Sequence, residues 1–291
     1  MAGSDVELVG LYWTISGPVE VHVGREWSYF DWKDRCAHAK RIGFSGLGIW
    51  HADLQHQLES STLDEIKSVF EDAGLRHLEL EFLWEWFLEP DDERRKAAEP
   101  IRNMLFEAGG TLGAHHIKVG NIPGTPCDLD TLTEKYAELC ADAANHTDAK
   151  IAYEFMPFDV NVHDLDTAIR LVEGAGASNG GLVIDTWHMS KLDIKPDDLR
   201  RIPLEYLTWI ELSDGQFEDM EDSIAEVTRF RALPGEGEFD IPGYIAVAQD
   251  MGYPGPWGVE VLADSLRNNP IEVIFDRSYE STASQFKAEV A

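Results

Sequence analysis

The chain has 291 residues, 44% of them hydrophobic, and its 54 acidic residues outnumber 24 basic ones to give a formal net charge of -30 at pH 7. This apolar content is enough for a sizeable core and excludes a largely disordered chain. The negative charge argues against a nucleic-acid partner and against docking on anionic membranes, because both require basic surfaces. We therefore expect a small-molecule partner.

The sequence predicts neither a membrane span nor a secretory signal. It contains no apolar run of about 18 residues, the length that a spanning helix needs, and its first five residues lack a basic region followed by an apolar stretch. Cys36, Cys127 and Cys140 are odd in number and lack the spacing of metal ligands. These features predict a cytoplasmic location, where thiols stay reduced.

Short apolar runs alternate with helical patterns along the whole chain. A strand is predicted over 6–15, a helix over 31–42, a strand over 44–50 and a helix that opens at the capping box Thr62-Leu63-Asp64-Glu65. A strand over 76–84, a helix over 91–108, a strand over 115–122 and a helix over 129–144 follow. Next come a strand over 149–156, a helix over 164–173, a strand over 181–187, a helix over 196–201 and a strand over 206–213. An acidic loop over 214–239, a helix over 241–251, a strand over 257–262 and a helical segment from residue 270 complete the chain.

Eight units of a strand followed by a helix are typical of a parallel sheet closed into a (β/α)8 TIM barrel. The alternative is an open, doubly wound sheet, which usually carries a Gly-x-Gly-x-x-Gly turn after its first strand. That turn is absent from the sequence. We therefore predict an α/β fold in which residues 1–291 form a single TIM-barrel domain.

Alternate residues of a barrel strand face the surrounding helices and the interior. In the fifth strand the bulky residues Ile151 and Tyr153 are expected to face the helices, which turns Glu154 inward. The same reasoning places one carboxylate inside on each of four consecutive strands, namely Glu154, Asp185, Glu211 and Glu260. On the third and fourth strands the predicted inward residues are Glu79, Glu81, His116 and Lys118.

Four converging carboxylates would repel one another unless cations accompany them. A divalent metal meets this need, and an all-oxygen set of ligands suits Mg²⁺ or Mn²⁺ better than Zn²⁺. The alternative is that each carboxylate pairs with Arg or Lys in the barrel core. Lys118 is the only inward cation that the strand pattern predicts, and Glu79 could bind it. Lys118 is also a candidate to bind the substrate.

Further candidates lie near the expected carboxyl ends of the strands. His188 follows Asp185 by three residues, and Glu81 and His51 could reach the same site. Five tryptophans near the same strand ends offer aromatic faces of the kind that suits sugar C–H groups, although packing in the core explains them at least as well. They are Trp13, Trp50, Trp84, Trp86 and Trp187. Within the acidic loop, Arg231 or its neighbour Arg229 could bind substrate oxygens or close a lid.

Five segments, in this order on the expected strands, resemble one known superfamily. They are Tyr153-Glu154, Asp185-Thr186-Trp187-His188, Glu211-Leu212-Ser213-Asp214, the segment Leu233-Pro234-Gly235-Glu236-Gly237-Glu238-Phe239-Asp240, and Gly258-Val259-Glu260. With them the chain resembles, over nearly its whole length, the xylose isomerase-like TIM-barrel superfamily, in its sugar isomerase/epimerase branch. That branch includes ketose 3-epimerases, hydroxypyruvate isomerase, inosose dehydratase and 3-dehydroshikimate dehydratase.

The resemblance implies a Mn²⁺, Mg²⁺ or Co²⁺ ion held by residues of strands five to eight. It carries over directly to Glu154, Asp185 and Glu260, with His188 as the histidine that contacts the substrate. Strand seven departs from the pattern, because many members have a histidine where this chain has Glu211. A carboxylate can still bind the metal, but its charge would weaken the Lewis acidity.

The resemblance further implies an enzyme that removes a proton next to a carbonyl of a polyhydroxylated sugar-like substrate, with Glu154 and Glu260 as the acid/base pair. Isomerisation or epimerisation is the first expectation. Dehydration or lyase chemistry, including cleavage of keto-glycosides, is the alternative. A second alternative is a non-catalytic sugar-binding or partner subunit in which Glu211 marks a decayed site. A homo-oligomer or a complex with a small partner subunit is also left open.

Overall fold

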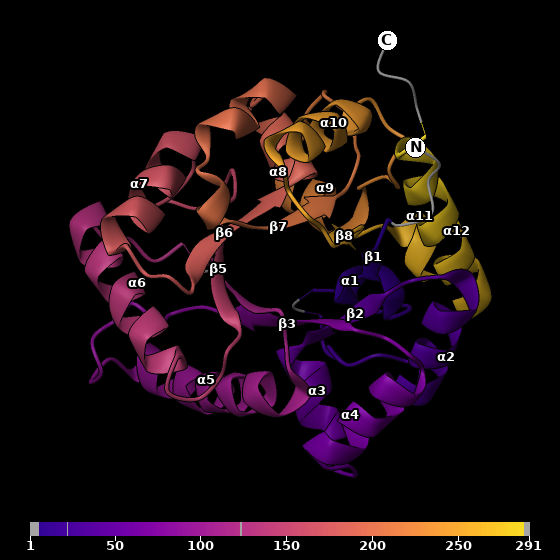
Figure 1. Cartoon of the computed structure of the whole chain (residues 1–291), viewed down its shortest axis with the longest axis horizontal. Helices are drawn as coiled ribbons and strands as arrows, with labels where there is room; N and C mark the ends of the chain where they lie inside the picture. Colours follow the sequence, from indigo (N-terminus) through magenta and orange to yellow (C-terminus); the bar gives the residue numbers. More distant parts are fainter. Residues whose placement is uncertain (1–5, 22, 123, 288–291) are drawn as a thin grey trace.

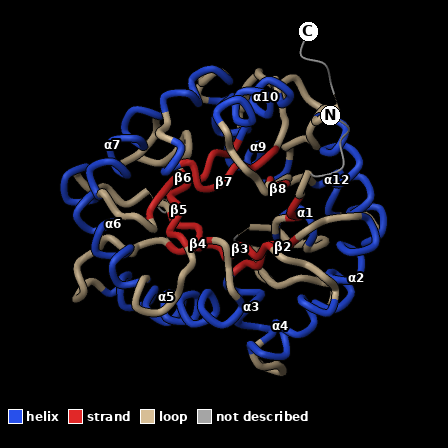
Figure 2. Tube along the Cα trace, in the orientation of Figure 1, coloured by secondary structure: helices blue, strands red, loops and turns tan. Residues whose placement is uncertain are grey.

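The computed structural model describes residues 6–21, 23–122 and 124–287. Eight parallel strands close into a barrel in chain order, with β8 hydrogen-bonded to β1, and a ring of helices surrounds them (Figure 1). The strands form the centre of the molecule and the helices its periphery (Figure 2). The predicted (β/α)8 TIM barrel is confirmed.

The strands are β1 (Leu8–Gly10), β2 (Gly46–Trp50), β3 (His77–Leu83), β4 (His116–Val119), β5 (Lys150–Glu154), β6 (Gly180–Asp185), β7 (Leu207–Leu212) and β8 (Trp257–Val259). The first α-helices are α1 (Tyr12–Ile15), α2 (Trp32–Ile42), α3 (His51–Gln57), α4 (Leu63–Asp72), α5 (Glu93–Leu112) and α6 (Leu129–Ala143). The later ones are α7 (Leu165–Ala175), α8 (Thr186–Lys191), α9 (Ser223–Arg229), α10 (Ile241–Met251), α11 (Asp264–Arg267) and α12 (Ile271–Gln285). Two 3-10 helices, η1 (Pro196–Arg201) and η2 (Leu204–Tyr206), precede β7.

Apolar clusters lie on both faces of the barrel strands, and they confirm the predicted alternation along the strands. Ile151 and Tyr153 belong to the large core between the strands and the helices. The residue between them, Ala152, packs with Val183 and Trp209 in a small cluster inside the barrel. The outward set is therefore bulky and apolar, and the inward set is free to carry the polar residues of a site.

Most predicted strands are longer than the observed ones, and in two of them the surplus residues form short helices at the barrel mouth. The apolar run 6–15 is divided between β1 and the short helix α1, because an apolar run alone does not distinguish a strand from a buried helix. The predicted strand 181–187 ends at Asp185, whose side chain accepts a hydrogen bond from the backbone N–H of Trp187 at 2.8 Å and so caps α8. His188 therefore lies on a helix.

The sequence did not predict two helices that surround the mouth. The helix α3 follows β2 directly, and α9 lies inside the segment 214–239 that was expected to be loop. Asp222 caps α9 by accepting a hydrogen bond from the N–H of Ala225 at 2.9 Å. Within the described ranges, no helix combines the length and the apolar character that crossing a membrane would require.

Candidate active site

Four carboxylates meet at the carboxyl ends of β5 to β8. Glu154 and Asp185 are the last residues of β5 and β6, Glu211 lies on β7, and Glu260 directly follows β8. Each offers one oxygen atom, and these four atoms all lie within 4.8 Å of one another. The backbone makes this convergence possible, because Asp185 pairs with Glu211 and Glu211 pairs with Gly258 across neighbouring strands. A Cβ atom at Gly258 would lie 3.2 Å from the Cγ of Glu211, so glycine leaves room for that side chain.

The ammonium group of Lys118, on β4, lies among five glutamates. Its Nζ atom is 2.7 Å from Glu211 and 3.0 Å from Glu260. The other three distances are 3.3 Å to Glu79, 3.3 Å to Glu81 and 3.8 Å to Glu154. The predicted inward position of Lys118 is confirmed. The sequence suggested Glu79 as its partner, and the structure adds four further glutamates.

Arg231 supplies a second buried cation. Its Nη1 atom donates a hydrogen bond to Asp185 at 2.6 Å and lies 3.6 Å from Glu260. The guanidinium also stacks over the ring of Trp187, with its Cζ atom 5.0 Å from the ring centroid. Ion pairs with Arg or Lys are the alternative to a metal. Lys118 and Arg231 form such pairs with some of the carboxylates.

His188 connects two of the carboxylates. Its Nε2 atom is 3.3 Å from Glu154 and 3.5 Å from Asp185. These three side chains are buried and form a second group that could hold a metal ion. The helix α8 positions His188 there, because the residue follows the capping Asp185 by three positions and so lies on the same face.

The buried charges shift the pKa values of these groups. Burial and the nearby charge of Glu260 raise the pKa of Glu211 well above its usual range. Burial alone would raise the pKa of Asp185, but the charges of Arg231 and His188 outweigh it and lower that pKa. Burial alone would lower the pKa of Lys118, but the surrounding glutamates raise it well above its usual range.

The side chains fit a divalent metal that prefers oxygen ligands. Six buried carboxyl groups outnumber the basic side chains that contact them in the described part of the barrel, which are Lys118, Arg231 and the imidazoles of His116 and His188. The six are Glu79, Glu81, Glu154, Asp185, Glu211 and Glu260. The buried Oε1 atom of Glu81 accepts no hydrogen bond from any described residue. A divalent ion would offset part of the excess negative charge, and the mainly carboxylate donor set suits Mg²⁺ or Mn²⁺.

A cavity of about 450 Å³ opens directly above these groups. Its charged lining consists of Glu81, Glu154, His188, Arg231 and Glu260. Its apolar lining consists of Trp13, Val21, Trp50, Phe82, Trp84, Ile122, Met156, Phe158, Ile224, Val227 and Leu262. Lys118, Asp185 and Glu211 are absent from this set of lining residues and are almost completely buried. Lys118 lies beneath the cavity, next to the lining residues Glu81, Glu154 and Glu260, and the substrate contact expected of it stays a prediction.

The predicted aromatic residues divide into two groups. Trp13, Trp50 and Trp84 line the cavity, whereas Trp86 and Trp187 belong to the core between strands and helices. His51 is the first residue of α3, and its ring contacts the rings of Trp50 and Trp84, with centroids 4.4 Å and 5.1 Å away. It therefore supports the cavity wall from behind.

Sequence reasoning missed the contribution of α9 to the site. Ile224, Val227 and Thr228 line the cavity from this helix. The available signal was the spacing of Ile224 and Val227, which are three residues apart within an acidic segment and so share one face of a helix. The position of that face above the barrel mouth could not be read from the spacing.

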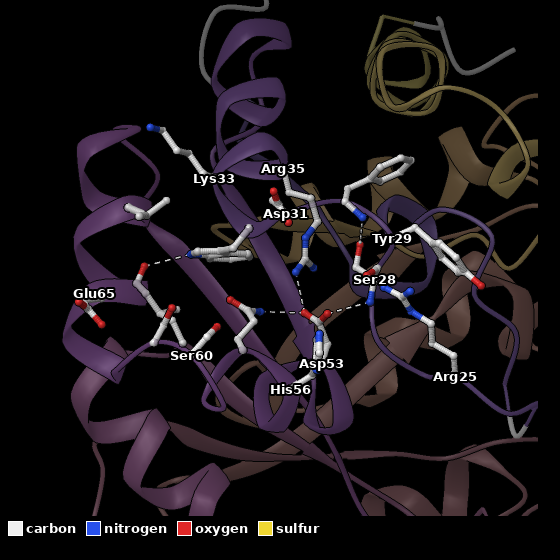
Figure 3. A pocket seen from close by; sticks show the side chains of 16 residues that line it. Arg25, Ser28, Tyr29, Asp31, Lys33, Arg35, Asp53, His56, Ser60 and Glu65 are labelled. Carbon is white, nitrogen blue, oxygen red and sulfur yellow. Dashed lines mark hydrogen bonds and ion pairs between the residues drawn. The ribbon is translucent and has the colours of Figure 1, made fainter.

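A second cavity, of about 340 Å³, lies beside the mouth between α2, α3, α4 and the segment 25–31 (Figure 3). Asp53 organises it, because its carboxylate accepts hydrogen bonds from Arg35 at 2.7 Å, Gln57 at 2.9 Å and the backbone N–H of Ser28 at 2.9 Å. These contacts tie α3 to α2 and to the segment after α1. The residues around this cavity therefore have a structural role: they fix α3, the helix that directly follows Trp50, against α2.

Comparisons with known proteins agree with this geometry. Residues 36–282 match the family model of the xylose isomerase-like TIM barrel. A 3-dehydroshikimate dehydratase of Pseudomonas aeruginosa is 28% identical over 235 residues, which are 78% of this chain and 36% of that protein. An inosose isomerase of Halalkalibacterium halodurans is 23% identical over 241 residues, which cover 77% of this chain and 80% of that protein. The chain thus spans about a third of the length of the dehydratases that it matches.

Solved structures show the same fold. The IOLI protein with a binding zinc atom has a TM-score of 0.80 and 17% identity, over 96% of this chain and 98% of that one. The D-psicose 3-epimerase of Clostridium cellulolyticum H10, solved with D-tagatose, has a TM-score of 0.69 and 16% identity, over 97% of both chains. At these identities the likeness establishes the barrel architecture, and the chemistry has to be argued from the site itself.

Proposed function

The chain belongs to the xylose isomerase-like TIM-barrel family, and from its mouth geometry we propose a divalent-metal-dependent enzyme that removes a proton next to a carbonyl of a polyhydroxylated substrate. Its relatives include dehydratases, isomerases and epimerases. The observation that carries the proposal is the pair Glu154 and Glu260. Both line the cavity floor, and both belong to the four-carboxylate cluster.

The proposed metal ligands are Glu154, Asp185, Glu211 and Glu260. When bound there, Mn²⁺ or Mg²⁺ would supply Lewis acidity to a substrate carbonyl and a neighbouring hydroxyl. Arg231 orients Asp185 through its 2.6 Å hydrogen bond. His188, which lies 3.3 Å from Glu154 and lines the cavity, is placed to hold a substrate oxygen beside that carboxylate.

Glu154 and Glu260 come from β5 and β8, so they approach a substrate from different sides. One carboxylate takes the proton from the carbon next to the carbonyl, and the electron pair of that C–H bond moves into an enediolate. Return of a proton from the other carboxylate gives an isomer or epimer. Departure of a hydroxyl or alkoxy group from the next carbon, with a proton from that carboxylate, gives an alkene and makes the enzyme a dehydratase or lyase.

Solvent exchange tests this proposal. Ketoses, inososes and 3-keto-glycosides are incubated with the protein and Mn²⁺ in D₂O, and deuterium at the carbon next to the carbonyl is measured. We expect exchange with at least one of these compounds. Glu154→Gln and Glu260→Gln each remove a base while keeping the size of the side chain, so each should slow exchange by about 10²-fold or more.

The control is Glu272→Gln, a change at an exposed glutamate of α12 that should leave exchange unchanged. Product formation at full rate without exchange would indicate a hydride shift instead of proton abstraction. Full activity of both glutamine variants would remove the acid/base roles. Absence of any turnover would favour a sugar-binding or partner subunit.

A further inference from the structure

The cavity above the candidate site has two chemically different sides. Glu154 and Glu260 approach it from the ends of β5 and β8, with Glu81 on β3 as a third carboxylate, whereas Trp13, Trp50, Phe82 and Trp84 stand at the ends of β1 to β3. In the closed ring of eight strands, β1, β2 and β3 face β5, β6 and β7 across the barrel (Figure 1). A ligand with its carbonyl at the carboxylates would therefore extend toward an aromatic wall.

The aromatic wall is continuous. The ring centroids of Trp13 and Trp50 are 4.9 Å apart, and those of Trp50 and Trp84 are 5.9 Å apart. Phe82 continues the row, with its centroid 6.3 Å from that of Trp84. Such a row offers faces and edges to a flat apolar group, which aromatic rings bind by offset stacking or by edge contacts.

Two polar groups of the cavity wall are engaged with the protein itself. The indole N–H of Trp50 donates a hydrogen bond to Glu26 at 3.2 Å, and the hydroxyl of Thr228 donates one to the carbonyl of Ile224 at 2.7 Å. A sugar hydroxyl placed against this part of the cavity would lose hydrogen bonds to water without replacing them, which is unfavourable. The wall therefore disfavours a ligand that carries hydroxyl groups along its whole length.

The outer rim of the cavity is also apolar. Ile224 on α9 is 67% exposed and Phe158 is 38% exposed, and both line the cavity together with Val227. An apolar group that reaches from the wall to this rim would cover side chains that otherwise contact water. The cavity volume of about 450 Å³ is within the usual range for ligands that are larger than a simple sugar.

We propose that the substrate is a keto sugar that carries an aromatic substituent, with the sugar carbonyl at Glu154 and Glu260 and the aromatic ring between Trp84 and Ile224. This inference rests on the proposed function for the position of the sugar end. The aromatic subsite itself rests on the lining of the cavity, so binding can test it without catalysis.

The binding experiment compares phenyl β-D-glucopyranoside with methyl β-D-glucopyranoside by titration calorimetry, using the full chain with Mn²⁺. Neither compound has a ketone, so neither needs turnover. We expect the phenyl compound to bind about 10- to 100-fold more tightly, because burial of one aromatic ring stabilises the complex by that factor. Trp84→Leu and Ile224→Ala should each reduce that preference at least threefold.

Matched controls change similar residues elsewhere. Phe286→Leu alters a ring that packs on Trp257 at the opposite end of the barrel, and Val273→Ala shortens an exposed side chain of α12. Both should keep the full preference for the phenyl compound. Equal affinity for the two glucosides, no measurable binding of the phenyl compound at millimolar concentration, or a preference retained by both cavity variants would overturn the aromatic subsite.

A kinetic comparison separates this inference from the proposed function. The phenyl and methyl 3-keto-glucosides are compared for deuterium exchange in D₂O. A kcat/KM at least tenfold higher for the phenyl compound supports both proposals. Equal exchange of the two compounds would overturn the subsite and leave the proposed function standing. If neither keto-glucoside exchanges although the phenyl compound binds through Trp84, proton abstraction from keto-glycosides is overturned and the subsite stands.

Discussion

Lys118 is the residue on which the charge balance of the barrel interior depends. Its ammonium group contacts five glutamates and is fully buried. Because these carboxylates come from β3, β5, β7 and β8, the contact with Lys118 also holds together strands on different sides of the barrel. Loss of the cation would leave several negative charges close together in a medium that solvates them poorly.

The first prediction concerns this cation. Lys118→Met should lower the free energy of unfolding by about 3–5 kcal/mol, the usual cost of removing one partner of a buried ion pair. Urea denaturation at pH 7 measures it. The control is Lys150→Met at the start of β5, where the side chain is only partly buried. Equal stability of the two variants would show that the glutamates are accommodated without Lys118.

At the scale of secondary structure, several helices begin close to where the sequence predicts them, because their caps are local. The predicted capping box at α4 is present in full. The N–H of Glu65 donates to the hydroxyl of Thr62 at 3.2 Å, and the N–H of Thr62 donates to the Glu65 carboxylate at 2.8 Å. Asp128 and Asp164 cap α6 and α7 by accepting a hydrogen bond from the backbone N–H of Thr131 and Thr167.

The second prediction tests the capping box. Thr62→Ala removes the hydroxyl that satisfies a free N–H in the first turn of α4, so it should destabilise the protein by about 1 kcal/mol. Thr62→Ser keeps the hydroxyl and should restore nearly all of that stability. Both values come from urea denaturation, and activity should not change, because α4 is on the outside of the barrel (Figure 1). A Thr62→Ala variant as stable as the parent protein would contradict the role of the cap.

For the whole molecule, the excess of buried carboxylates links stability to the proposed metal. A ligand that binds only the folded state at a hundred times its Kd stabilises that state by about 2.7 kcal/mol. We therefore predict that Mn²⁺ raises the Tm of protein treated with a chelator by about 5–10 °C, since 1 kcal/mol shifts the Tm of a domain of this size by about 2–4 °C.

Variants assign the ligands in the same thermal experiment. Asp185→Asn should abolish most of the Mn²⁺-dependent shift, whereas Asp92→Asn, at the exposed cap of α5, should leave it intact. Glu211→His should keep the shift and Glu211→Ala should reduce it if Glu211 is a ligand. Retention of the full shift by both Glu211 variants would remove this residue from the ligand set, and absence of a shift in the parent protein would oppose a metal centre.

Sequence alone determined the barrel and the direction of its key side chains. Alternation with a period of two is a local property of a strand, so Ile151 and Tyr153 sufficed to turn Glu154 inward, and the same pattern applied to Asp185, Glu211 and Glu260. Capping is also local, which is why the start of α4 could be predicted.

Only the tertiary structure decided which charges meet and what lies above them. Lys118 reaches Glu260 across 142 residues of sequence, and Arg231 reaches Asp185 across 46, because closure of the barrel brings the ends of distant strands together. The same closure places the helix α9 over the mouth and gathers Trp13, Trp50 and Trp84 into one wall. Such contacts depend on how strands and helices pack, and no pattern within a single segment of the chain encodes them.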